Sequence, residues 1–134
     1  MAIFTHVAIG TNDIAKARAF YDGVLGPLGY KRVADFSDGG SAWGETAPEF
    51  FVLKPANGQP ATFANGGTVS FVAPNRAAVA AFHKAALAAG GYKMPHGGND
   101  PLNLPECVTG ERESKDMIFL NARSSQSDRR FVRS

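Results

Sequence analysis

The stretch HVAIGTNDIAKARAFYDGVLGPLGY at residues 6–30 has a diverged second copy in the same chain, TVSFVAPNRAAVAAFHKAALAAGGY at residues 68–92. The two copies lie 62 residues apart and share seven identities in 25 positions without a gap. The identities include phenylalanine, leucine, glycine and tyrosine, which coincide by chance less often than the abundant alanines. This period exceeds the roughly 20–50 residues typical of solenoid repeats, so the sequence indicates a duplicated half-domain.

Each copy has the pattern of a strand, a helix and a second strand. Residues 3–9 predict the first strand, Asn12 or Asp13 caps the following helix, and residues 30–36 resume as a strand. In the second copy residues 69–72 predict a strand and Asn75 opens the helix. The apolar stripes of the two helices are Ile14, Ala17, Tyr21, Val24 and Leu25, and then Val79, Phe82, Ala86 and Leu87. Lys16 and Arg18 lie on the polar side of the first helix and are interpreted as solvated charges.

Two more strands are predicted between the copies, at residues 41–45 after an Asp-Gly-Gly turn and at residues 49–54. The first half of the chain is therefore expected to have the order β-α-β-β-β over about 62 residues. The last 34 residues are different, because 11 of them are charged, against 15 of the first 100. The one strand predicted there covers residues 117–121, which leaves open whether the second half is complete.

The composition limits the class of protein. The 134 residues are 44% hydrophobic and 19% charged, with a net charge of +2, which indicates one folded domain. The single cysteine excludes an intrachain disulfide. No apolar run is long enough to cross a membrane, and the first basic residue is Lys16, so no signal peptide is expected. No basic arm for nucleic acid is found in the first hundred residues, and we expect a cytoplasmic protein.

The duplication, its spacing and the opening strand with His6 resemble the vicinal oxygen chelate superfamily, which includes glyoxalase I, bleomycin-resistance proteins and extradiol dioxygenases. The similar residues are 6–33, 41–55 and 67–93. The resemblance implies an α+β fold in which paired βαβββ modules form a curled mixed sheet, and commonly a homodimer. We expect a single domain over residues 1–134, with module one at about 1–62, module two at about 63–122 and a polar tail at 123–134.

The resemblance also implies a place for a metal. Metal-using members hold one divalent ion, such as zinc, nickel, iron or manganese, with His, Glu or Gln ligands from the first and last strands of each module. His6 stands at the first ligand position, and Glu49, at the edge of a last strand, is a candidate ligand or catalytic base. The position equivalent to His6 in the second copy is Thr68, which is not a competent ligand.

The residues leave alternative roles open. His6 is either a metal ligand or a strand histidine bonded to a polar neighbour. Trp43 and Phe51 either line a pocket for a flat ligand or belong to the core. His96, in a glycine-rich loop, either contacts substrate or is solvated.

Three hypotheses about the function therefore compete. The first is a metal-dependent lyase or dioxygenase acting on a small oxygenated substrate, with His6 as metal ligand. The second is a metal-free protein that binds a small molecule such as a drug, with Trp43 and Phe51 against the ligand. The third is a degenerate, non-catalytic member of the superfamily with no small-molecule role.

Overall fold

The structure, a computed structural model, describes residues 3–62, 68–90, 92–93, 108–110 and 118–124. Within these residues the chain twice follows the order strand, helix, strand, strand, strand. The first run consists of β1 (Val7–Gly10), α1 (Ile14–Leu25), a short 3-10 helix η1 (Gly26–Leu28), β2 (Lys31–Asp35), β3 (Ser41–Gly44) and β4 (Phe50–Leu53). The second consists of β5 (Thr68–Ala73), α2 (Arg76–Ala88), β6 (Tyr92–Lys93), β7 (Val108–Gly110) and β8 (Ile118–Ser124). The expected α+β fold with paired βαβββ modules is confirmed.

The two helices begin with the same local chemistry. The Asp13 side chain accepts a hydrogen bond from the backbone N–H of Lys16 at 3.0 Å. The Asn75 side chain accepts one from the N–H of Ala78 at 2.8 Å. Each cap satisfies an N–H that the helix itself leaves unpaired. The two capping residues are 62 residues apart, and so are the two residues that donate to them. The duplication seen in the sequence therefore extends to the N-terminal caps of the helices.

Each run forms its own four-stranded sheet. The strand order is β1-β4-β3-β2 in the first, called sheet A, and β5-β8-β7-β6 in the second, called sheet B. In both sheets the first strand pairs in parallel with the last, and the other pairs are antiparallel. Among the described strands, β1 and β5 each pair on one side, so each is an edge of its sheet.

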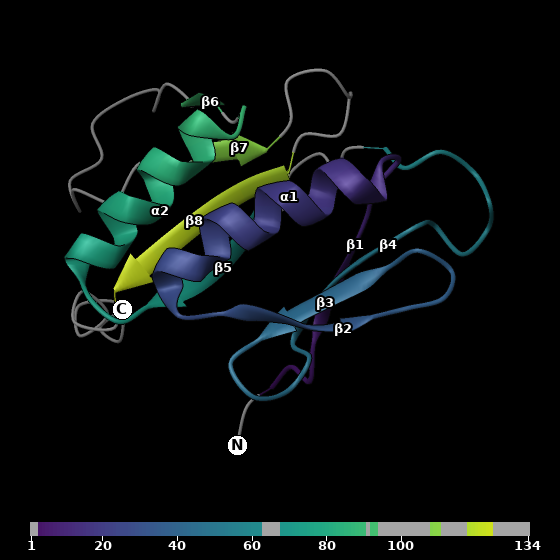
Figure 1. The fold of residues 1–134 in the computed structure, drawn as a ribbon, viewed down its shortest axis with the longest axis horizontal. Coiled ribbons are helices and arrows are strands. Elements are labelled where there is room, and N and C mark those ends of the chain that lie inside the picture. Colours follow the sequence, from purple (N-terminus) through teal and green to yellow (C-terminus); the bar gives the residue numbers. More distant parts are fainter. Residues whose placement is uncertain (1–2, 63–67, 91, 94–107, 111–117, 125–134) are drawn as a thin grey trace, which may run out of the picture.

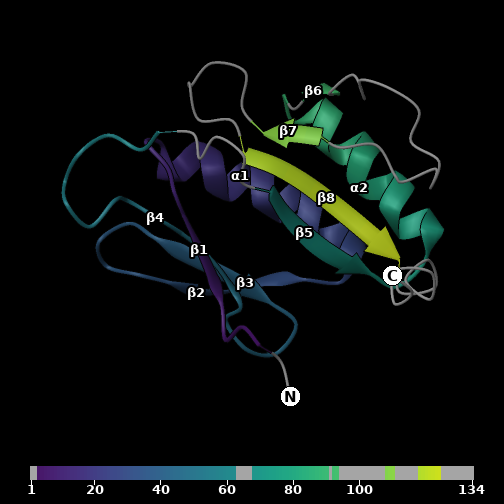
Figure 2. The same cartoon turned by 180° about the vertical axis from the view of Figure 1, so that it is seen from behind.

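The helices and the core join the two sheets. Helix α1 contacts α2, and it crosses in front of β5 and β8 in Figure 1 and behind them in Figure 2. The ring of Phe71 on β5 lies 5.1 Å from that of Phe50 on β4 and 6.3 Å from that of Phe82 on α2. Buried side chains from both runs thus belong to one hydrophobic cluster.

Several details differ from the sequence-based expectation. The first strand, predicted over residues 3–9, is shorter and begins at Val7. Strand β8 extends to Ser124, beyond the predicted residues 117–121, and β7 was not predicted. With β6, these strands give the second run all five elements. Strand β7 has only three residues and ends in Gly110, so it is too short to show an alternation of apolar and polar residues in the sequence. It is recognised in the structure by its pairing with β6 and β8. Leu87, expected in the apolar stripe of α2, is 39% exposed, whereas Ala78 is buried.

Candidate functional site

Sheet A presents two different faces, because successive side chains of a strand point to opposite sides. Trp43 on β3 and Phe50 on β4 pack against Tyr21 of α1, with ring centroids 5.5 and 5.0 Å from the tyrosine ring. Both are buried, at 1% and 5% exposure. The next residue of β4, Phe51, belongs to the opposite face, which α1 does not cover.

That opposite face carries a cluster of rings, which we call the aromatic face and define as His6, Phe36 and Phe51. The imidazole of His6 lies 4.9 Å from the Phe51 ring, and the Phe36 ring stacks on Phe51 at 5.8 Å with an interplanar angle of 6°. His6 and Phe36 are exposed and Phe51 is half-buried. Small residues surround the cluster, since Ala8 and Ala42 both pair with Phe51 in the sheet. The structure thus brings together two of the predicted site residues, His6 and Phe51.

The described residues do not fit a metal centre. No group of three His, Cys, Asp or Glu side chains suited to a metal occurs among them. The Nδ1 atom of His6 lies 2.9 Å from the hydroxyl of Thr5, and its ring packs on Phe51, so the neighbours of this imidazole are a hydroxyl and aromatic carbon. A structural zinc site takes four ligands and a catalytic one takes three from the protein. The predicted site residue His96 lies outside the described residues.

A cavity of about 220 Å³ lies where the ends of β1, β3 and β4 face β5. Glu49, Trp43 and Tyr30 line it together with apolar side chains. The connection from β3 to β4 turns back over Gly44, where a Cβ atom would overlap the carbonyl of Ala47. The amide of Glu49 then donates to the carbonyl of Trp43 at 3.0 Å. The structure therefore places Glu49 and Trp43, two further predicted site residues, at this cavity.

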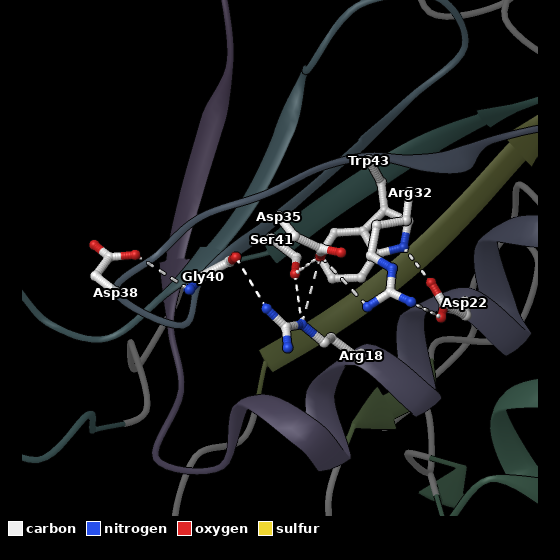
Figure 3. A network of polar contacts seen from close by, with 8 residues as sticks. All are labelled: Arg18, Asp22, Arg32, Asp35, Asp38, Gly40, Ser41 and Trp43. Atoms are coloured by element: carbon white, nitrogen blue, oxygen red, sulfur yellow. Dashed lines mark hydrogen bonds and ion pairs between the residues drawn. The ribbon is translucent and has the colours of Figure 1, made fainter.

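A polar network fastens α1 to β2 and β3 (Figure 3). The Arg18 guanidinium donates to the Ser41 hydroxyl at 2.7 Å and to the Gly40 carbonyl at 3.3 Å. The Ser41 hydroxyl donates to Asp35 at 2.5 Å. This hydrogen bond is the main reason why the pKa of Asp35 is lowered below its ordinary value. Desolvation opposes the shift, and the charges of Arg32 and Arg18 add to it. Arg18, expected to be a solvated charge, is in fact held by β3.

The same network fixes the indole of Trp43. Its N–H donates to the carboxylate of Asp22 on α1 at 2.9 Å. Arg32 on β2 lies 3.4 Å from Asp22 and 3.4 Å from Asp35, so it bridges the two carboxylates (Figure 3). None of these charged residues was predicted, because their partners are distant in sequence and no local motif marks them. The network orients a residue of the cavity wall but itself lies on the helix side of the sheet.

Comparison with known proteins shows the family of the chain. The sequence model of the Glyoxalase/Bleomycin resistance protein/Dioxygenase superfamily matches residues 3–102. The chain belongs to this superfamily. Among curated proteins, none matches the chain. Neither helix in the described part of the chain is long and apolar enough to span a membrane.

Solved structures of the superfamily agree with the observed fold. A glyoxalase/bleomycin resistance protein from Albidiferax ferrireducens is 34% identical, with a TM-score of 0.69 over 91% of this chain and 99% of that one. A glyoxalase/bleomycin resistance protein/dioxygenase family enzyme from Burkholderia phytofirmans is 15% identical, with a TM-score of 0.61 over 90% and 98%. The fosfomycin resistance protein FosX from Listeria monocytogenes, in complex with Mn(II) and sulfate, is 10% identical, with a TM-score of 0.61 over 95% and 94%. The last two likenesses show the fold.

Proposed function

We propose that the protein binds a flat organic molecule on the aromatic face of sheet A, as a metal-free small-molecule-binding member of its superfamily. The observation that carries this proposal is the exposed ring cluster of His6, Phe36 and Phe51. Phe36 is 36% exposed although it is a large apolar side chain, and α1 packs on the other side of the sheet. Exposed apolar residues that form a group, rather than standing singly, are typical of interaction sites.

The chemistry of this face favours a planar ligand. Stacked or edge-on aromatic pairs contribute about 0.5–1.5 kcal/mol beyond the area that they bury. Ala8 and Ala34, which share the face by their pairing in the sheet, are small side chains that are not buried. The imidazole of His6 adds one polar edge to an otherwise apolar surface. A ligand with a flat ring and one hydrogen-bonding group matches this arrangement.

We also propose that two copies of the chain associate through exposed apolar side chains at the edges of β1 and β5. Ile3 and Phe4, just before the edge strand β1, are 89% and 71% exposed, and Val72 on the edge strand β5 is 62% exposed. Apolar side chains along open strand edges promote association with another chain. Analytical ultracentrifugation tests this directly. A dimer that weakens on Val72→Asp supports the proposal, and a monomer at all concentrations contradicts it.

A flat probe and a puckered probe of the same carbon skeleton test the ligand proposal. We expect 2-naphthol to shift the backbone amide NMR signals of Phe36 and Phe51 in a saturable way, and decahydro-2-naphthol to bind about tenfold more weakly because it cannot stack. Phe51→Ala should abolish the difference between the probes. Leu87→Ala, which removes an exposed side chain from α2, is the matched control and should leave it unchanged. Equal binding of both probes to the unmodified protein would refute the stacking argument.

The competing function is a metal-dependent lyase or dioxygenase with His6 as a ligand and Glu49 as ligand or base. Its support is the position of His6 on a face of the sheet, and the fold shared with FosX, which was solved with Mn(II). Elemental analysis of untagged protein separates the two functions. A stoichiometric metal that is lost in His6→Ala would favour the enzyme. Binding of 2-naphthol by metal-free protein would favour the binding function.

A further inference from the structure

The cavity beside β5 is a second site, separate from the aromatic face. It lies on the side of Trp43 and Phe50, and its lining includes neither Phe51 nor Phe36. We propose that this cavity binds a small organic ammonium group, with the carboxylate of Glu49 as its counter-charge. This inference goes beyond the proposed function, because it concerns another place and another class of ligand.

Four of the eleven residues that line the cavity are aromatic. Trp43, Phe50, Phe71 and Tyr30 all contribute to the lining. The rings of Phe50 and Phe71 meet edge to face at 5.1 Å, and those of Trp43 and Phe50 are 6.2 Å apart. The ring face of an aromatic residue carries negative potential and attracts cations, most strongly when the cation is desolvated. Aromatic side chains are the groups that proteins commonly use to bind quaternary ammonium ions.

The polar groups of the cavity favour a cation over an anion. The indole N–H of Trp43 donates a hydrogen bond to Asp22, and the hydroxyl of Tyr30 donates one to the carbonyl of Val72 at 2.7 Å. Among the described lining residues, the side-chain donors of Trp43 and Tyr30 are therefore already used. The remaining side-chain donor is the exposed hydroxyl of Ser70. Among the residues that the structure describes, no Lys, Arg or His contributes to the lining. An anion would find little to neutralise it here.

Glu49 supplies the negative charge. In the part of the chain that the structure describes, its carboxylate has neither a salt bridge nor a side-chain hydrogen bond. Burial, and then the charges of Glu49 and Glu45, raise the pKa of the Tyr30 hydroxyl above its ordinary value. A volume of about 220 Å³ admits a small amine rather than a drug-sized molecule.

The fluorescence of Trp43 gives a direct measurement, because it is the only tryptophan of the chain. The probes are choline and 3,3-dimethylbutanol, which have the same shape but differ in charge. We expect choline to change the Trp43 emission in a saturable way and the neutral alcohol to bind about tenfold more weakly. Glu49→Gln should reduce choline binding to the level of the alcohol.

Two control variants complete the experiment. Asp38→Asn removes one negative charge at a turn outside the cavity lining, and Phe51→Ala alters the aromatic face. Both should leave choline binding unchanged, so that a failure here is distinct from a failure of the proposed function. Far-UV circular dichroism confirms that each variant is folded. Equal affinity for the two probes, no saturable change with either, or full choline binding by folded Glu49→Gln would overturn the proposal.

Discussion

Replacing either of two neighbouring phenylalanines by alanine should have very different consequences. Phe50 is 5% exposed, and its ring meets those of Tyr21 at 5.0 Å and Phe71 at 5.1 Å. Truncation of a buried phenylalanine leaves a cavity and typically costs about 3–5 kcal/mol. Natural domains are stable by only about 5–15 kcal/mol, so Phe50→Ala should bring the protein close to unfolding.

Phe51→Ala removes the same atoms as Phe50→Ala, but from a less buried environment. It is half-buried, and its ring partners His6 and Phe36 are themselves exposed. About half of the roughly 1.5–3 kcal/mol for a fully buried side chain, together with part of an aromatic pair energy, gives a cost of about 1–2 kcal/mol. Because both variants replace Phe by Ala on one strand, their loss of strand propensity is the same and cancels in the comparison.

Urea denaturation and thermal unfolding, each followed by far-UV circular dichroism, measure both costs. At about 4 °C per kcal/mol for a domain of this size, Phe50→Ala should lower the melting temperature by roughly 12–20 °C and Phe51→Ala by roughly 4–8 °C. Phe51→Ala should also lose the preference for 2-naphthol, which Leu87→Ala keeps. Losses of stability that agree within about 1 kcal/mol would refute the assignment of the two rings to different faces.

Further predictions concern the helix caps, a turn and a carboxylate. Asp13→Ala and Asn75→Ala should each cost about 1 kcal/mol in thermal unfolding, and strongly unequal losses would argue against equivalent caps. Gly44→Ala should cost about 1–3 kcal/mol, because its Cβ would overlap the backbone carbonyl of the loop that crosses it. Gly23→Ala, with open space around it on α1, should instead stabilise by about 0.5–1 kcal/mol, and a similar loss at both glycines would contradict this. The pKa of Asp35 is lowered in the folded protein, so the ionised carboxylate stabilises the fold above the ordinary carboxyl pKa, and this stabilisation is lost as the pH falls through the folded value. The stability of Asp35→Asn, measured in urea from about pH 7 to pH 3, should therefore fall less than that of the unmodified protein. Parallel stability curves for the two proteins would contradict this.

Local chemistry explains what the sequence predicted well. The 62-residue period located both helices, and the caps Asp13 and Asn75 mark their first residues because a cap acts within three positions. The predicted strands at 41–45 and 49–54 correspond to β3 (Ser41–Gly44) and β4 (Phe50–Leu53). These features depend on neighbours in the chain, so a single sequence was enough to find them.

The parts of the site that depend on distant contacts could not be predicted. Arg18 was interpreted as solvated because the helix pattern shows only that it is polar, whereas its partner Ser41 is 23 residues away. The alternation of β3 and β4 separates Trp43 from Phe51 but does not say which face α1 covers. That choice follows from the packing of Tyr21, and it places Trp43 against the helix and Phe51 on the open side.

One short segment connects the two proposed sites and also keeps them apart. Glu49 lines the cavity, Phe50 belongs to the core, and Phe51 belongs to the aromatic face. Because Phe50 packs between the helix and β5, a change there should disturb both sites and the stability together. Glu49→Gln and Phe51→Ala each alter one surface and leave the ring of Phe50 in place. Loss of choline binding without loss of 2-naphthol binding, and the reverse, would therefore report two independent sites and could not arise from a general loosening of β4.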